Sequence, residues 1–108
     1  MNILDLTNKL EKGKNLGGEI VYIKEENIIY GIDSVYKDQE EQSVTVLRSK
    51  DDTIKVDHFL TLLNEIYANL GDKEVLIGSK EYTRDSVREI TSIEFAQYES
   101  SKMLFINI

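Results

Sequence analysis

Apolar residues recur at helical spacing near the start of the chain. The side chains that share one stripe of residues 3–12 are Ile3, Leu6 and Leu10, with Leu4 at its margin. Because residues three and four positions apart lie on the same side of an α-helix, this spacing predicts an amphipathic helix. Gly13 follows the last of these positions, and we expect it to end the helix in a left-handed conformation.

A second stretch, residues 57–70, has the same periodicity and a broader apolar face. Its apolar positions are Phe59, Leu62, Leu63, Ile66 and Leu70. Asp57 stands where a carboxylate can accept hydrogen bonds from backbone N–H groups of the first turn, so we expect it to be the N-cap. Gly71 stands where a glycine commonly ends a helix. A helix over residues 57–70 is therefore predicted.

Short apolar runs bounded by polar turns predict β-strands. Three such runs follow the predicted helix in each half of the chain. They cover residues 19–24, 32–37 and 44–47 in the first half, and residues 74–78, 90–95 and 103–108 in the second. The predicted order of elements is α-β-β-β followed by α-β-β-β.

The two halves also share local sequence. NLGGEIVYI at residues 15–23 is similar to NLGDKEVLI at residues 69–77, and IDSVYK at residues 32–37 is similar to ITSIEF at residues 90–95. The apolar stripes of the two helices match at an offset of 56 residues, and the last pair of segments matches at an offset of 58. The matches occur in the same order along the chain.

These matches predict an internal duplication of an α-β-β-β unit, with pseudo-repeats at residues 1–50 and 51–108. The alternative is that both halves share only generic amphipathic patterning, since Leu-Gly pairs after helices are common. Each half is too small to build a core by itself, and the only candidate seam, RSKDDT at residues 48–53, is too short to separate domains. We therefore expect one α+β domain over residues 1–108, with antiparallel sheet or sheets and both helices packed on one face.

Two of the predicted strands are apolar on both faces. In EIVYIK the side chains of Ile20 and Tyr22 point one way while those of Val21 and Ile23 point the other, and the last strand, MLFINI, is similar. A strand that is apolar on both faces is buried on both sides. The second face would therefore meet the other half, a second subunit or a partner.

Charge and composition limit the class of partner and the compartment. The formal net charge is −7 at pH 7, and Lys and Arg are scattered among acids rather than clustered as nucleic-acid binding requires. The chain begins without a basic n-region and has no run of about 20 apolar residues, so we expect neither a signal peptide nor a membrane span. The absence of cysteine fits a reducing compartment. We expect a cytoplasmic protein that binds no nucleic acid directly and no membrane.

The composition also indicates an origin. Alanine occurs only at Ala68 and Ala96, proline is absent, and Ile, Lys, Glu and Asn are abundant. This bias is typical of an AT-rich genome, such as that of a low-GC Gram-positive bacterium or one of its phages.

No pattern selects a catalytic or metal site. Cysteine is absent and His58 is the only histidine, so nucleophilic catalysis would need remote partners that the sequence does not identify. We expect His58 to be a surface or boundary residue. Asp51, Asp52, Asp57 and His58 lie close together along the chain, but their spacing matches no EF-hand or zinc motif. We therefore expect no enzyme activity, no metal and no cofactor.

Two further polar patterns favour structural interpretations. The glycines of GKNLGG, residues 13–18, follow a helix and lead into a strand, which reverses the order of a phosphate-binding loop. Adjacent acids, which glycosidases use in pairs, occur at Glu25-Glu26, Glu40-Glu41 and Asp51-Asp52. They are typical of solvated turns, and no tryptophan offers a platform for a sugar.

Tyrosines beside polar turns are the candidate binding residues. Tyr30, Tyr36 and Tyr98 stand beside such turns, and Glu40 and Glu41 lie in one of them. Tyrosine is favoured at interfaces because a large apolar ring carries a polar tip, although the same residue also packs well on strands. These five residues form the predicted partner-binding set.

Two functions are expected from these features. The first is a non-enzymatic, small acidic protein-binding module or inhibitor that meets another protein with a basic surface, where charge raises the association rate. A phage or mobile-element accessory protein fits this description. The alternative is a small-molecule-binding regulatory domain with a site between the two repeats. A homodimer is compatible with either function.

Overall fold

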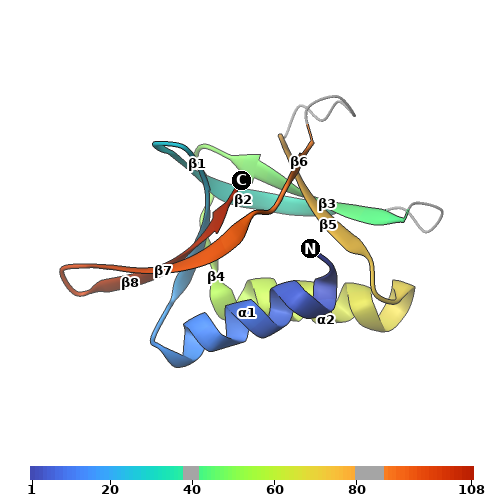
Figure 1. The fold of residues 1–108 in the computed structure, drawn as a ribbon, viewed down its shortest axis with the longest axis horizontal. Helices are drawn as coiled ribbons and strands as arrows, with labels where there is room; N and C mark the ends of the chain where they lie inside the picture. Colours follow the sequence, from blue (N-terminus) through green and yellow to red (C-terminus); the bar gives the residue numbers. More distant parts are fainter. Residues whose placement is uncertain (38–41, 80–86) are drawn as a thin grey trace.

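The computed structural model describes residues 1–37, 42–79 and 87–108 (Figure 1). Its helices are α1 (Ile3–Asn15) and α2 (Val56–Leu70). Its strands are β1 (Ile20–Glu25), β2 (Ile28–Tyr36), β3 (Ser43–Ser49), β4 (Ile54–Lys55), β5 (Glu74–Ser79), β6 (Arg88–Glu89), β7 (Ser92–Tyr98) and β8 (Ser101–Asn107). Both predicted helices and all six predicted strands have counterparts, and the short strands β4 and β6 are additions to them.

The strands form one mixed sheet. Their order is β6-β5-β3-β2-β1-β8-β7, and β4 pairs with β1 outside this order. The neighbours β1–β8 and β3–β5 are parallel, while the other pairs are antiparallel. The α+β class is confirmed, but the prediction of an antiparallel sheet is wrong for these two pairs. Both join strands from different halves, and β3 reaches β5 through α2, the kind of crossover that parallel strands require.

The sheet is curled, and its two edge strands, β6 and β7, follow each other directly along the chain. β6 and β7 stand at opposite ends of the strand order, yet only Ile90 and Thr91 separate them along the chain. Ile90 is buried at this bend. The helices α1 and α2 lie side by side on one side of the curled sheet (Figure 1).

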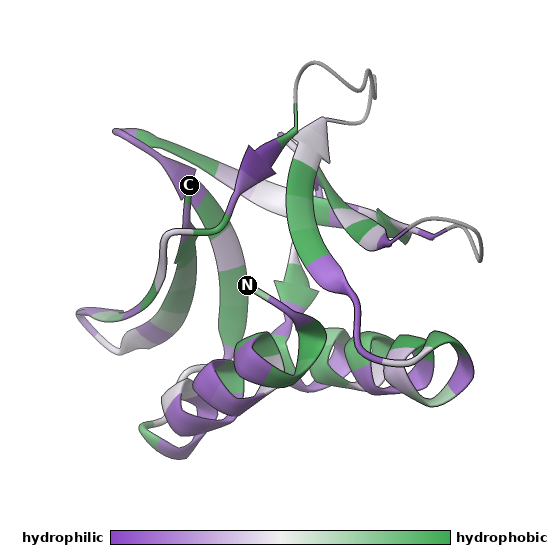
Figure 2. Ribbon diagram, turned by 45° about the vertical axis from the view of Figure 1, so that its right-hand side comes forward, coloured by the Kyte–Doolittle hydropathy of each residue, from purple (hydrophilic) through white to green (hydrophobic). Residues whose placement is uncertain are grey.

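One cluster of buried apolar side chains joins both helices to the sheet. Its members include Ile3, Leu6 and Leu10 of α1, Phe59 and Leu63 of α2, and Val21, Val46, Ile77 and Leu104 of the strands. Hydrophobic and hydrophilic bands alternate along both helices, as their amphipathic patterns predict (Figure 2). Because the cluster takes members from both halves, each half covers apolar surface of the other. Among the described residues, neither helix is long and apolar enough to cross a membrane.

The buried residues of α1 and α2 occupy equivalent positions in the two helices. α1 begins at Ile3 and α2 at Val56, 53 residues later. Every buried position of α1 recurs in α2 at this same offset, ending with Gly13 and Ile66. The structure thus relates the helices by 53 residues rather than by 56, a difference of about one helical turn.

The strand registers repeat as well. In the parallel pairs, Val21 lies opposite Leu104 as Val75 lies opposite Val44. The antiparallel pair β1–β2 recurs as β5–β6, and β2–β3 recurs as β7–β8. A bulge after Ile32 interrupts β2, and the equivalent segment of the second half is interrupted between β6 and β7. The pairing pattern of the first half therefore recurs in the second.

The glycines at the helix ends differ from expectation in one case. Gly13 lies inside α1, which continues to Asn15, so the prediction that it ends the helix is wrong. Gly17 adopts the left-handed backbone instead, with φ +105°. Gly71 ends α2 with φ +83°, as predicted.

The N-terminus of α2 also differs. The helix begins at Val56, so Asp57 lies in its first turn, and the prediction that Asp57 is the N-cap is wrong. Lys55 holds the N-cap position and its side chain makes no capping hydrogen bond. In α1 the equivalent residue is Asn2, whose Oδ1 accepts a hydrogen bond from the N–H of Asp5 at 2.9 Å. The two helices therefore share a boundary but not a cap.

Candidate functional site

The turn between β1 and β2 carries the most prominent pair of exposed apolar residues on the sheet. Ile28 and Ile29 are 53% and 51% exposed. Successive residues of a strand point to opposite faces, so an apolar side chain emerges on each face of the hairpin. The acids Glu25 and Glu26 precede them, and Glu26 has a positive φ of +54° in the turn. We call residues 25–29 the hairpin tip.

A charged cluster supports the hairpin tip from β3. Arg48 Nη1 donates a hydrogen bond to Glu25 Oε2 at 3.2 Å, and both side chains are largely buried, at 20% and 26% exposure. The Arg48 guanidinium also lies over the Tyr30 ring, 4.7 Å from its centroid. Arg48 stacks on Tyr30 and pairs with Glu25, so the conformational entropy it loses is shared between two contacts. This cluster therefore holds the base of the tip in place.

The structure does not gather the predicted partner-binding residues on one surface. Tyr30 is half-buried under Arg48 near the hairpin tip. Tyr36 and Tyr98 are exposed, but they end β2 and β7, whose ends lie at opposite ends of the long axis (Figure 1). Glu40 and Glu41 lie outside the described residues.

Sequence reasoning passed over the hairpin tip. The predicted strand begins at residue 32, whereas β2 begins at Ile28, so Ile28 and Ile29 are absent from the predicted set. A signal was available in their position directly after the polar EEN turn. Two successive apolar residues at a hairpin turn cannot both face one core, so at least one is exposed or meets a partner.

A groove of about 210 Å³ separates α1 from the strands β7 and β8. Its lining residues are Lys9, Lys12, Gly13, Leu16, Ile93, Phe95 and Leu104. Leu16 is 61% exposed, and the lysines stand beside an otherwise apolar wall. We call this the α1 groove. It combines two positive charges with aliphatic and aromatic surface.

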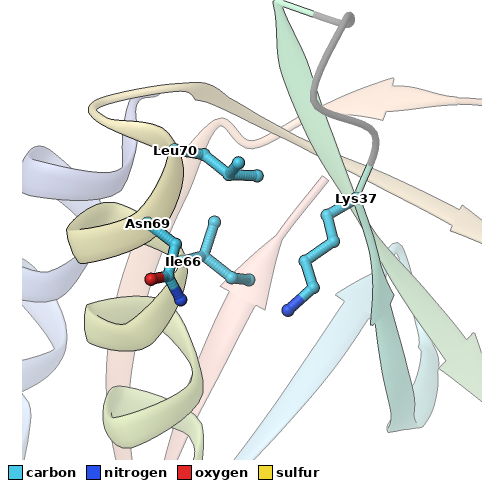
Figure 3. A pocket seen from close by; sticks show the side chains of 4 residues that line it. All are labelled: Lys37, Ile66, Asn69 and Leu70. Carbon is cyan, nitrogen blue, oxygen red and sulfur yellow. The ribbon is translucent and has the colours of Figure 1, made fainter.

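A second groove, of about 440 Å³, lies between α2 and the end of β2 (Figure 3). Its described lining residues are Lys37, Ile66, Asn69 and Leu70, and Figure 3 shows the Lys37 side chain extending toward Ile66. We call this the α2 groove. It is the counterpart of the α1 groove, because Ile66 and Asn69 occupy the helix positions of Gly13 and Leu16. Each groove is lined by residues from both halves of the chain.

The end of α1 meets the start of α2 through an ion pair. Lys14 Nζ lies 2.5 Å from Asp57 Oδ1. Hydrogen bonding to the Asp57 carboxylate, together with its negative charge, raises the pKa of Lys14 above its ordinary value. Both side chains are well exposed. The pair links the two helices at the surface. The Asp57 carboxylate is thus already paired with a lysine of its own chain.

The outer face of β1 and β8 has a small cluster of its own. Phe105 is 1% exposed but lies opposite the main core, since its neighbours Leu104 and Ile106 point inward. Lys24 Nζ lies 5.2 Å from the Phe105 ring centroid and 3.9 Å from Glu94 Oε1. This chain's own side chains therefore cover part of the second apolar face that the sequence predicts.

The other residues that the sequence singles out lie at the start of α2 and between α1 and β1. His58 is exposed in the first turn of α2, where a surface or boundary histidine is predicted. Within residues 1–37, 42–79 and 87–108, no three His, Cys, Asp or Glu side chains are close enough to share a metal ion. Gly17 and Gly18 lie in the connection from α1 to β1, so these glycines follow a helix and lead into a strand, as the sequence predicts.

Comparisons with known proteins add no relative. No protein-family model matches the sequence, and neither the curated proteins nor the solved structures contain a match to this chain.

Proposed function

We propose that this protein is a non-enzymatic binding module that docks on another protein through the hairpin tip. The observation that carries the proposal is the adjacent exposure of Ile28 and Ile29. Burying a half-exposed isoleucine in an interface removes apolar surface from water, which is the main favourable term in protein association. The cluster of Glu25, Arg48 and Tyr30 limits the entropy lost on docking, because it already orders the base of the tip.

Charge selects the kind of partner. Glu26 is exposed in the turn itself, Glu25 beside it is paired with Arg48, and the whole chain carries a formal net charge of −7. Complementary potentials steer encounter and disfavour partners of like charge. The partner proposed is therefore a protein surface with an apolar depression rimmed by Lys or Arg.

The test compares variants in which only the tip is changed. The double substitution Ile28→Ser and Ile29→Ser removes the apolar pair, and Leu4→Ser removes an exposed apolar residue from α1 as the matched control. A protein captured by the tagged wild type should be lost with the tip variant and retained with Leu4→Ser. Calorimetry with the purified partner should show the same difference. Equal binding by all three proteins would overturn the proposal.

A second candidate is a small-molecule regulator with a site between the halves. The observation that favours it is the α2 groove, since its volume of about 440 Å³ falls in the range typical of ligand pockets. Lys37 and Asn69 would orient an anionic or polar group, and Ile66 and Leu70 would cover its apolar part. A metabolite that raises the melting temperature of the wild type but not of Lys37→Met would support this function. A flat response across a broad panel would count against it.

An internal duplication is the proposed origin of the fold. The proposal is supported by the constant offset of 53 residues between the buried positions of α1 and α2. Further support comes from the strand pairs of the main order β6-β5-β3-β2-β1-β8-β7, each of which has a counterpart with the same orientation. The duplication accounts for two grooves at equivalent places, and their different lining residues allow them to take different occupants.

A further inference from the structure

The α1 groove has the opposite charge to the hairpin tip. Lys9 and Lys12 line it beside Leu16, Ile93 and Phe95. The ion pairs found among the described residues involve Lys14, Lys24 and Arg48, and neither groove lysine takes part in one. Although the whole chain has a formal net charge of −7, this groove presents two lysines that form no ion pair among the described residues.

A third lysine stands close to the same end of α1. Lys102 Nζ lies 3.1 Å from the point where a β-carbon on Gly17 would be, so it is next to the turn that follows Leu16. Lysine side chains bury their aliphatic stems on apolar surface while the ammonium groups stay in water. The groove therefore offers apolar contact area in its centre and cations around it.

Such a groove suits a segment that carries aliphatic side chains next to carboxylates. The chain itself displays one segment of this kind, because the hairpin tip sets exposed Ile28 and Ile29 beside Glu26, which is exposed and takes part in none of the ion pairs among the described residues. The tip is also narrow, since β2 turns back on β1 directly at Ile28, opposite Glu25. Its charge and its apolar content match the α1 groove.

We infer that the hairpin tip of one copy docks in the α1 groove of a second copy of this chain. The inference rests on the proposed function, in that it names the basic surface that the tip binds. Contact between two different surfaces is heterologous. The copy at one end of an open assembly therefore keeps a free tip, and the copy at the other end keeps a free groove. The assembly grows as a head-to-tail chain, or closes into a ring if the rotation between copies allows it.

Sedimentation of the purified protein tests the inference without any foreign partner. The weight-average mass of the wild type should rise between about 10 μM and about 1 mM, the range expected of a small interface. The groove variant combines Lys9→Glu with Lys12→Glu, and the tip variant combines Glu26→Lys with Ile29→Lys. Each alone should associate at least about tenfold more weakly, because like charges then face each other.

The decisive sample is the mixture of the two variants. The groove variant keeps a native tip and the tip variant keeps a native groove, so together they form the native contact, and the reversed charges of the altered tip and the altered groove also attract each other. The mixture should therefore associate, although each variant alone associates weakly. A variant that merely misfolds cannot restore association in this way. The mixture therefore distinguishes loss of the docking contact from loss of the folded structure.

The control is Lys37→Glu, which reverses one positive charge in the α2 groove, whereas the groove variant reverses two in the α1 groove. It should associate like the wild type. A wild type that stays monomeric throughout, or an assembly that neither variant weakens, would overturn the inference. In either case a tip-dependent complex with a different protein would still stand, so failure here is distinct from failure of the proposed function.

Discussion

The side chain of Leu104 fills the space beside Gly13, where a β-carbon would lie 2.3 Å from Leu104 Cδ2. This contact explains why a glycine occupies a helix interior despite an intrinsic cost of about 1 kcal/mol relative to alanine. It lets the end of α1 approach β8 closely. At the equivalent position of α2 the residue is Ile66, so the two helices pack on the sheet differently at their ends.

Substituting Gly13→Ala should destabilise the protein. The gain in helix propensity is about 1 kcal/mol, but inserting a methyl group into a packed core costs about 1–3 kcal/mol, and Leu104, which fills this space, is fully buried. We expect a net loss of about 1 kcal/mol in the free energy of unfolding, measured with urea. The shorter Leu104→Val should make room, so Gly13→Ala should cost less in that background. An equal loss of stability in both backgrounds would show that the contact with Leu104 is not the reason for a glycine at position 13.

Replacing Glu25→Gln should weaken the base of the hairpin tip. Arg48 would keep its place over Tyr30 but lose the carboxylate that neutralises it in a largely buried setting. We expect a loss of about 1–2 kcal/mol, more than for an exposed ion pair. A double-mutant cycle with Arg48→Met measures the coupling directly. A coupling energy near zero would mean that the pair contributes nothing.

Giving α2 the cap that α1 has should stabilise the protein. Lys55 makes no side-chain hydrogen bond at the N-cap, whereas the equivalent Asn2 does. Lys55→Asn should raise the free energy of unfolding by about 1 kcal/mol, and the reciprocal loss of a cap in Asn2→Ala should lower it by a similar amount. Thermal unfolding of the two variants gives both values. A decrease for Lys55→Asn would contradict the equivalence of the two helix starts.

The pair of Lys14 and Asp57 predicts a specific pH dependence. The partner carboxylate raises the pKa of Lys14 in the folded state above its ordinary value of 10.5. A lysine of raised pKa contributes stability that is fully present below the unfolded pKa and is lost as the pH rises through the folded pKa. The contribution of this pair should therefore persist at neutral pH and disappear as the pH rises into the alkaline range.

An NMR titration of the Lys14 side chain checks this dependence. The midpoint should move down in Asp57→Asn, because the hydrogen bond and the negative charge are both removed. The matched control is Asp52→Asn, which removes an exposed acid that makes no ion pair among the described residues. Unchanged titration of Lys14 in Asp57→Asn would show that the pair does not form in solution.

Two features of the candidate site could not be predicted from the sequence: the contact of Arg48 with Tyr30 and the exposure of Ile28 and Ile29. Tyr30 was predicted to meet a partner, but whether it does depends on Arg48, which reaches it only when β3 pairs with β2. Ile28 and Ile29 resemble any pair of strand residues until the hairpin exposes them. Exposure is a property of the assembled sheet, so composition and local pattern cannot assign it.

By itself, the sequence determined the two helices, the main strands and their order. The positions of Leu6 and Leu10, or of Val21 and Ile23, set a periodicity that only one kind of backbone can bury on a single face. The folded structure was needed to establish that β1 lies parallel to β8 and β3 to β5, and hence that the sheet is mixed and curled. The reason is physical: periodicity is a property of neighbouring residues, whereas strand partners are chosen by the lowest free energy over all the surfaces that the whole chain can bury together.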